Sequence, residues 1–466
     1  MRRVWSLTLA LSVSCAVGPD YERPPVETPA AWRDGQADPA SLADLEWWKL
    51  FGDPVLNELI EIAIRSNFDE RLALERVAEV RARLGFVKAD LYPRLDAGAA
   101  AGVIHESRRA TPLSPLIRDP DHQTYELFGA LSWELDLFGR IRRATEAERA
   151  QLSAAEEERH AVRVSVVAEV SRAYLELRDL DARVAIAQGT VASRKGYVDM
   201  ARLRWEGGKT SELDFRQAEA ELGRTESVLA ELERQAVQRE NDVAFLLGRS
   251  PGAIRRGRPL TEFPVPPKVP IGLPSALLER RPDIRAAEQQ LVSANARIGE
   301  AKALMYPQIV LTAEGGYSST SLHGFLKSPA GFWQVIGGLT APIWDWGKNR
   351  FRVEETEARA RQAVILYERS IRQALRDVED ALVSYRKSTE RLASSGRRVT
   401  AQRSVLTLSE SRYRGGVSPY LEVLDAQREL FDAELEQSSA RRDELVSLVQ
   451  IYRALGGGWS AVPRNP

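Results

Sequence analysis

The 466-residue sequence contains one cysteine and has no run of 18 apolar residues. The single cysteine, Cys15, excludes an intrachain disulfide. The lack of a long apolar run excludes a transmembrane α-helix. The net charge of −1 provides no basic field that would indicate nucleic acid binding. Glu, Arg, Ala and Leu dominate the composition, which favours long helices.

Sequence signals of catalysis and metal binding are also missing. The four histidines have no metal-ligand spacing with one another or with Cys15. No phosphate-binding loop, nucleophile elbow or H-E-x-x-H motif occurs. The many carboxylates fall on expected helix faces, where solvation is the default. We therefore predict no catalytic residue, no metal site and no enzyme activity.

The chain contains two copies of one unit. Tyr92-Pro93 recurs as Tyr306-Pro307, and three further motifs recur at a common, slightly shorter offset. These are Phe138-Gly139-Arg140 with Trp346-Gly347-Lys348, Trp205-Glu206-Gly207-Gly208 with Tyr413-Arg414-Gly415-Gly416, and Leu247-Gly248 with Leu455-Gly456. A repeated unit of about 210 residues predicts a pseudo-symmetric architecture.

The repeats and the N-terminus set the expected domains. A charged start and a short apolar stretch predict a signal peptide over 1–14. Cys15 follows at once and resembles the lipid-attachment site of bacterial lipoproteins; an incidental cysteine is the alternative. We expect a lipidated extended segment over 15–53, a first repeat over 54–250, a Pro-rich linker over 251–275, a second repeat over 276–456, and a tail over 457–466.

Each repeat contains a stretch of about 65 residues without proline, namely 140–204 and 348–412. A helix of that length would run about 100 Å, which is typical of coiled coils. From Val166 to Val191 the apolar residues step 4-3-4-3, and the second stretch keeps this register from Ala374 to Val399. Each long helix ends at a glycine pair, where a positive φ permits a reversal of the chain.

Shorter helices are predicted on either side of these long ones. Helices of about 211–247 and 419–455 return after the glycine pairs, and helices of about 68–91 and 282–305 precede the non-helical segments. Ser418 is placed to cap the last helix, with Pro419 in its first turn. Each repeat is thus expected to form two helical columns topped by a β-hairpin.

The expected hairpins span about 95–137 and about 308–345, where apolar residues recur at every second position. Strands of about 10 residues or slightly more, with one apolar face, suit a tilted crossing of a bilayer. A soluble hairpin lying on helices is the alternative. Pro342 fits a strand only where that strand is ending. Four strands cannot close a barrel and open edges are not tolerated in lipid, so a membrane barrel requires a dimer of eight strands or a trimer of twelve.

Four motifs, taken in order within this duplicated frame, resemble the TolC/OprM-type outer-membrane factors, the exit ducts of tripartite efflux systems. They are the segments 15–24 (CAVGPDYERP), 136–140 (DLFGR), 280–284 (RRPDI) and 412–428 (RYRGGVSPYLEVLDAQR). The resemblance implies a mostly α fold, with long coiled-coil helices forming an α-barrel and four transmembrane β-strands per protomer in a trimeric 12-stranded barrel. It also implies a homotrimer in the cell outer membrane that extends into the periplasm. The lipid on Cys15 would be its anchor, no cofactor is implied, and its partners would be a periplasmic adaptor protein and an inner-membrane pump.

The family's gate maps onto the second glycine-pair turn. By resemblance, Leu421 matches an apolar constriction and Asp425 an acidic ring. Arg428 and Tyr413 match tethers that hold neighbouring helices together. An ordinary exposed helix pair between Asp425 and Arg428 is the alternative. The implied periplasmic tip turns are Gly207-Gly208 and Gly415-Gly416.

The sequence therefore predicts a passive, gated outer-membrane duct through which a tripartite efflux pump exports small molecules, with its partners supplying the energy. Two alternatives remain: a duct for secreted polypeptides, and a periplasmic coiled-coil scaffold lipoprotein that forms no channel.

Overall fold

The computed structural model describes residues 16–33, 46–105, 121–264 and 274–457. The expected signal peptide, Cys15 and nearly all of the expected tail lie outside these residues. Within the described residues, no helix has both the length and the apolar character needed to cross a membrane.

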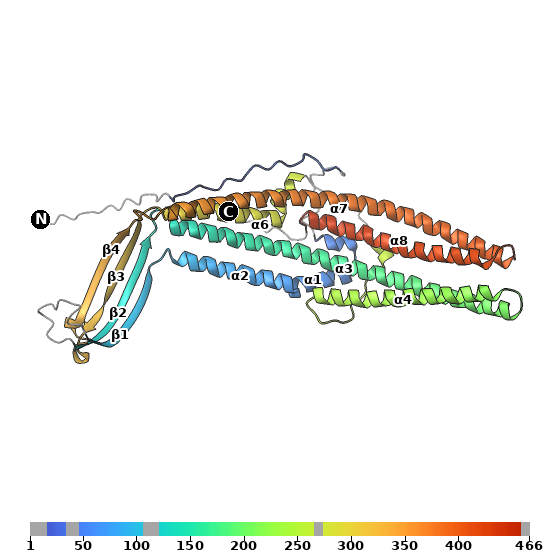
Figure 1. The fold of residues 1–466 in the computed structure, drawn as a ribbon, viewed down its shortest axis with the longest axis horizontal. Helices are drawn as coiled ribbons and strands as arrows, with labels where there is room; N and C mark the ends of the chain where they lie inside the picture. Colours follow the sequence, from blue (N-terminus) through green and yellow to red (C-terminus); the bar gives the residue numbers. More distant parts are fainter. Residues whose placement is uncertain (1–15, 34–45, 106–120, 265–273, 458–466) are drawn as a thin grey trace. The chain divides into compact units, whose positions relative to one another are not determined.

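The helices follow the duplicated pattern of the sequence (Figure 1). The first repeat contains α2 (Phe68–Ala89), α3 (Arg140–Glu206) and α4 (Glu212–Leu246), and the second contains α6 (Pro282–Ala303), α7 (Lys348–Arg414) and α8 (Tyr420–Ala454). The bounds of α7 and α8 are displaced from those of α3 and α4 by the offset that the three motifs share, and the bounds of α6 are displaced from those of α2 by the offset between the two Tyr-Pro pairs. The sequence offsets therefore describe a true structural repeat. The shorter elements are η2 (Trp47–Phe51), α1 (Pro54–Ser66), η3 (Leu260–Glu262), η4 (Pro274–Ala276), α5 (Leu277–Arg280), η5 (Leu322–Gly324) and η6 (Ser328–Ala330).

The predicted heptad seam is buried. Val166, Val170 and Leu177 on α3 are almost inaccessible, and so are Ala374 and Val378 on α7. Spacing of this kind keeps one stripe of a long helix against its neighbours throughout its length. The coiled-coil prediction is thereby confirmed in both repeats.

The described chain divides into two compact units, which differ from the sequence repeats. One unit comprises the described part of Met1–Pro25 together with Val77–Ala155 and Ala287–Tyr367, and contains the β-sheet. The other comprises the described parts of Val26–Arg76, Glu156–Ala286 and Glu368–Pro466, and contains α4, α8 and both glycine-pair turns.

The first unit holds one antiparallel sheet of four strands in the order β1-β2-β3-β4 (Figure 1). The strands are β1 (Arg94–His105), β2 (Asp121–Leu135), β3 (Gln308–Ser319) and β4 (Gly331–Thr340). Both expected hairpins are present, and pairing of β2 with β3 joins them into one sheet. The second hairpin ends at Thr340 rather than near residue 345. Pro342 accounts for this correction, because it has no N–H to donate to a ladder.

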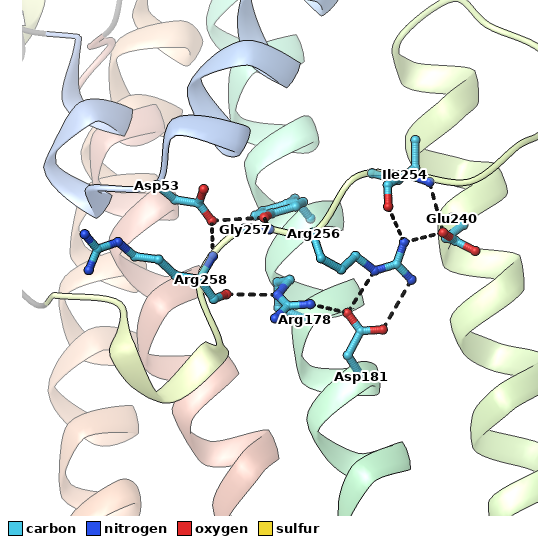
Figure 2. Close-up of polar contacts among 9 residues, drawn as sticks. Asp53, Arg178, Asp181, Glu240, Ile254, Arg256, Gly257 and Arg258 are labelled. Atoms are coloured by element: carbon cyan, nitrogen blue, oxygen red, sulfur yellow. Dashed lines mark hydrogen bonds and ion pairs between the residues drawn. The ribbon is translucent and has the colours of Figure 1, made fainter.

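In the second unit, the start of the segment between the repeats is held by polar contacts of residues 254–258 (Figure 2). The fully buried Asp53 carboxylate caps α1 and accepts a hydrogen bond from the Arg258 backbone N–H at 3.1 Å. Arg256 forms ion pairs with Asp181 of α3, at 3.0 Å, and with Glu240 of α4. Arg256 and Arg258 thereby connect the start of the linker to α1, α3 and α4.

Candidate functional site

The register of the sheet separates its side chains into two chemically different faces. One face carries Leu95, Ala97, Ala99, Leu127, Leu131, Trp133, Ile309, Leu311, Ala313, Trp333, Val335 and Leu339. No charged residue falls on this face between Leu95 and Val103 in β1, or on the residues of the other strands paired in the same rows. A continuous apolar face of this size suits contact with lipid.

The opposite face carries the strand carboxylates Asp96, Glu126, Glu134 and Glu314. Arg94 pairs with Asp96 at 2.9 Å, and Arg140 pairs with Glu134 at 2.7 Å. Glu126 and Glu314 instead accept hydrogen bonds from neutral side chains, those of Ser318 (3.5 Å) and Gln334 (2.8 Å) respectively. This face therefore combines water-compatible groups with two carboxylates that have no cationic partner among the residues the structure describes.

Aromatic side chains lie at both ends of the strands. Tyr125 of β2 lies opposite Ser319, the last residue of β3, and its ring contacts that of Phe325, with centroids 6.3 Å apart. At the opposite end, the Trp133 indole donates to the Leu91 carbonyl at 3.0 Å, and the exposed rings of Trp344 and Trp346 pack edge to face. Rings at both strand ends are typical of residues at membrane interfaces.

The two glycine-pair turns lie at the same end of α3, α4, α7 and α8 (Figure 1). Gly208 and Gly416 adopt φ values of 67° and 72°, so the left-handed conformation falls on the second glycine of each pair. The Lys209 N–H donates to the Arg204 carbonyl at 2.8 Å, and the Val417 N–H donates to the Arg412 carbonyl at 2.9 Å. These bonds make both turns Schellman caps of the long helices.

The helices that follow the turns start differently in the two repeats. Ser211 caps α4, and its hydroxyl accepts a hydrogen bond from the Leu213 N–H at 3.1 Å. At the equivalent position of α8 stands Pro419, with no side-chain capping bond. The prediction that Ser418 caps α8 is therefore wrong, because Pro419 occupies the cap position and leaves Ser418 one residue too early.

An apolar cluster, which we call the tip core, packs the helices together beside the turns. It consists of Ala201 on α3, Phe215 and Ala218 on α4, and Tyr420, Val423 and Leu424 on α8. Tyr413 on α7 packs against it, with its ring 5.5 Å from that of Tyr420. The Arg204 guanidinium lies 5.0 Å from the Tyr413 ring centroid, so Tyr413 connects α7 to α3 as well as to α8.

Arg428 on α8 reaches across to α4. Its Nε lies 2.6 Å from Oε2 of Glu221, whereas its contact with Asp425 is 3.8 Å. Arg194 on α3 holds the same Glu221 carboxylate at 2.7 Å. Burial alone would raise the pKa of Glu221, but the hydrogen bonds from Arg194 and Arg428 outweigh it and hold this pKa below its ordinary value of 4.5. Of the two ion pairs of Arg428, the one with Asp425 is thus the longer. The Glu221 carboxylate, shared by Arg194 and Arg428, links α3, α4 and α8.

Leu421 and Asp425 lie on the exposed side of α8. Leu421 is 48% exposed and the Asp425 side chain is 63% exposed, whereas the adjacent Val423 and Leu424 are buried in the tip core. In a single chain, the side chains of Leu421 and Asp425 are therefore exposed and can contact another molecule.

One further link between α3 and α7 was not predicted from the sequence. The Tyr197 hydroxyl on α3 donates a hydrogen bond to the Glu410 carboxylate on α7. Burial, and then Glu410 itself, raise the pKa of Tyr197 to about 12. Neither Tyr197 nor Glu410 belongs to a sequence motif. The pairing of Arg194 with Glu221 was likewise not predicted, because nothing in the sequence shows that these two residues would face each other.

Metal binding finds no support in the part of the chain that the structure describes. No group of three or more His, Cys, Asp or Glu residues is arranged there to hold a metal ion.

Comparisons with known proteins agree with this arrangement. The family model described as outer membrane efflux protein matches residues 59–249 and 273–457. The chain is 35% identical over 454 residues to the solvent efflux pump outer membrane protein SrpC of Pseudomonas putida, covering 96% of each. It is 31% identical over 462 residues to the probable outer membrane lipoprotein SilC of Salmonella typhimurium, covering 97% of each.

A solved structure is similar over nearly its whole length. The crystal structure of the open state of the MtrE outer membrane channel of Neisseria gonorrhoeae superposes with a TM-score of 0.86. The two chains are 32% identical, and the match covers 95% of this chain and 98% of that one.

Proposed function

Because this chain belongs to the outer membrane efflux protein family and acts as an outer-membrane efflux channel, we propose that three copies form one gated duct. The four-stranded sheet carries this proposal. It is apolar on one face and acidic on the other, and β1 and β4 are its two edges. Lipid does not tolerate open edges, so β4 of one copy would pair with β1 of the next. Three copies supply twelve strands, the number that the sequence resemblance implies.

In this duct the acidic face would line the water-filled interior. Three copies would place six carboxylates there from Glu126 and Glu314 alone, since each copy contributes two. Fixed negative charges along a pore favour cations over anions. Solutes would pass through the interior without a tight binding site, and the partners would select them.

The gate is proposed at the second turn. Leu421 and Asp425 would converge on the threefold axis, where they form an apolar constriction and an acidic ring. Tyr413 and Arg428 would hold α7 and α8 against α3 and α4 in the resting state. The contacts of Arg428 with Glu221 and of Tyr413 with Arg204 support this role, as does the existence of an open state in the related MtrE channel.

The proposed partners are a periplasmic adaptor and an inner-membrane pump, and the proposed anchor is a lipid on Cys15. SilC, a relative across nearly the whole chain, is named as a lipoprotein. The glycine-pair turns would face the adaptor, and Val417 is 70% exposed there. A cysteine at Val417, crosslinked in intact cells, should capture a periplasmic adaptor protein. Capture at the sheet end instead, from a cysteine at Leu326, would contradict this orientation.

Conductance in planar bilayers tests the duct directly. The purified protein should form cation-preferring channels. The combined change Glu126→Gln and Glu314→Gln should lower the cation-to-anion permeability ratio by about threefold or more, because it removes six interior charges. A matched pair, Glu231→Gln and Glu226→Gln on the exposed surface of α4, should leave the ratio unchanged. Absence of any conductance, or equal effects of both pairs, would argue against this interior.

A further inference from the structure

A cavity of about 300 Å³ lies in the second unit between α3, α7 and α8. Its apolar wall includes Ile186 on α3, Leu406 on α7, and Leu430 and Phe431 on α8. Its polar lining includes Arg194. A mostly apolar cavity with a few polar groups is typical of a small-molecule site.

Arg194 is only 3% exposed, yet it uses only part of its hydrogen-bonding capacity. Its Nη1 makes the contacts with Glu221, at 2.7 Å to the carboxylate and 3.0 Å to the carbonyl, and also contacts the Thr225 hydroxyl. Nε and Nη2 are buried and find no hydrogen-bond partner among the described residues. Leaving buried charged donors unpaired is costly, so these two nitrogens indicate room for an acceptor.

Nε and Nη2 form one edge of the planar guanidinium. This edge presents two parallel N–H groups and matches the two oxygens of a carboxylate. The Phe431 ring centroid lies 5.5 Å from the Arg194 guanidinium carbon, so an apolar surface adjoins this edge. The Gln427 side chain, 8% exposed, adds an amide oxygen that has no partner among the described residues.

Arg194 shares its carboxylate partner with two other arginines. The Glu221 carboxylate lies within ion-pair distance of Arg194, Arg428 and Arg224, at 2.7, 2.6 and 3.5 Å. One buried carboxylate thus serves three guanidinium groups. Two exposed carboxylates pair with the other arginines: Asp425 with Arg428 at 3.8 Å, and Asp432 with Arg224 at 3.9 Å. Glu221 is thus the only carboxylate that pairs with Arg194 among the described residues. Glu434 also lines the cavity, but Arg403 pairs with it at 2.8 Å.

We propose that this cavity is a binding site for a small carboxylate with an apolar or aromatic body. The carboxylate accepts hydrogen bonds from Nε and Nη2 of Arg194, and the body packs against Leu430 and Phe431. A donor group on the ligand, where present, reaches the Gln427 amide oxygen. The site lies in the helical wall, and its existence does not depend on how the gate works.

Two glycines of α3 provide a matched test. A Cβ at either Gly189 or Gly196 would meet no atom within 4 Å, but only Gly189 lines the cavity. Gly189→Leu should therefore fill the cavity, and Gly196→Leu should change the helix in the same way without touching it. Both variants leave Arg194 and Glu221 in place, so neither creates an unpaired buried charge.

Binding of 1-naphthoate to the purified full-length protein can be measured by isothermal titration calorimetry. We expect a Kd below about 1 mM, in line with the modest efficiency of small ligands. Gly189→Leu should weaken binding by about tenfold or more, and Gly196→Leu should not change it. Neutral 1-naphthylmethanol should bind at least tenfold more weakly than 1-naphthoate, because it cannot engage both nitrogens.

Equal binding of the two naphthalene compounds would overturn the proposal, as would undiminished binding to Gly189→Leu. A high-resolution structure soaked with 1-naphthoate that shows only ordered water at Nε and Nη2 would also overturn it. Arg194→Lys separates charge from geometry. It retains the positive charge beside Glu221 but should lose the preference for the carboxylate over the alcohol.

Discussion

Replacing Arg428 and Tyr413 together by alanine should convert a mostly closed channel into a mostly open one. Arg428→Ala removes the bond to Glu221, and Tyr413→Ala removes the ring that contacts both Tyr420 and Arg204. A partly exposed ion pair or cation–π contact stabilises the conformation that contains it by about 1 kcal/mol. Each 1.4 kcal/mol changes an equilibrium tenfold, so the pair should shift the closed-to-open ratio by about tenfold or more per subunit.

Single-channel recording in planar bilayers measures this shift as a rise in conductance. Arg412→Ala is the matched control, because Arg412 lies beside the same turn. Its ion pair with Glu422, at 3.4 Å, joins two exposed side chains. That pair should be worth little, and the control should conduct like the wild type. Equal conductance of the control and the double variant would show that loss of any nearby arginine suffices. Unchanged conductance of the double variant would remove the tether role.

Placing an arginine on the apolar face of the sheet should prevent assembly in the outer membrane. Leu131 on β2 pairs with Leu95 on one side and Ala313 on the other, in the middle of that face. Leu131→Arg would bring a charge into the hydrocarbon at a cost of about 2–4 kcal/mol in every copy. The amount of mature protein in isolated outer membranes should fall severely, as measured by quantitative immunoblotting.

The neighbouring residue gives the control, because side chains of a strand alternate between faces. Ala130 pairs with Asp96 and Glu314 on the acidic face, where a new arginine finds opposite charges. Ala130→Arg should therefore assemble normally. If Ala130→Arg fails and Leu131→Arg assembles, the faces have been assigned the wrong way round.

The helical part of this fold could be predicted because its signals are local. Proline-free stretches and the heptad spacing fixed α3 and α7 to within a single helical turn of their ends. The constant offset between the repeats then predicted the ends of α7 and α8 from those of α3 and α4. The burial of Val170 and Val378 follows from the same spacing.

Other features depend on contacts between distant residues. Pairing of β2 with β3 joins segments that are separated in the chain by α3, α4, α5 and α6, and no pattern within either strand specifies this pairing. The aromatic helix η2 falls in a segment expected to be extended, and it is held by stacking of Trp47 on Tyr452 at 5.1 Å. A stack of this kind cannot be read from local sequence.

The residues of the proposed gate illustrate the same limit. Resemblance placed Arg428 at a tether, but the sequence offered only Asp425, one turn away, as its partner. The closer partner is Glu221, which lies in the first repeat and is buried by packing of α4 against α8. Electrostatic partners across helices depend on how the helices are rotated, which periodicity specifies only for the apolar seam.

Disulfide trapping between the two edges of the sheet tests the shared barrel most directly. A cysteine at Ala99 on β1 would be combined in turn with one at Trp333, Val335 or Gly337 on β4, all on the apolar face. At the correct register, oxidised outer membranes should yield a covalent trimer that a reducing agent converts back to monomers. The variants with only one of the two cysteines should yield no covalent trimer. Only monomers at every register, or a ladder that ends at dimers, would contradict a barrel built from three copies.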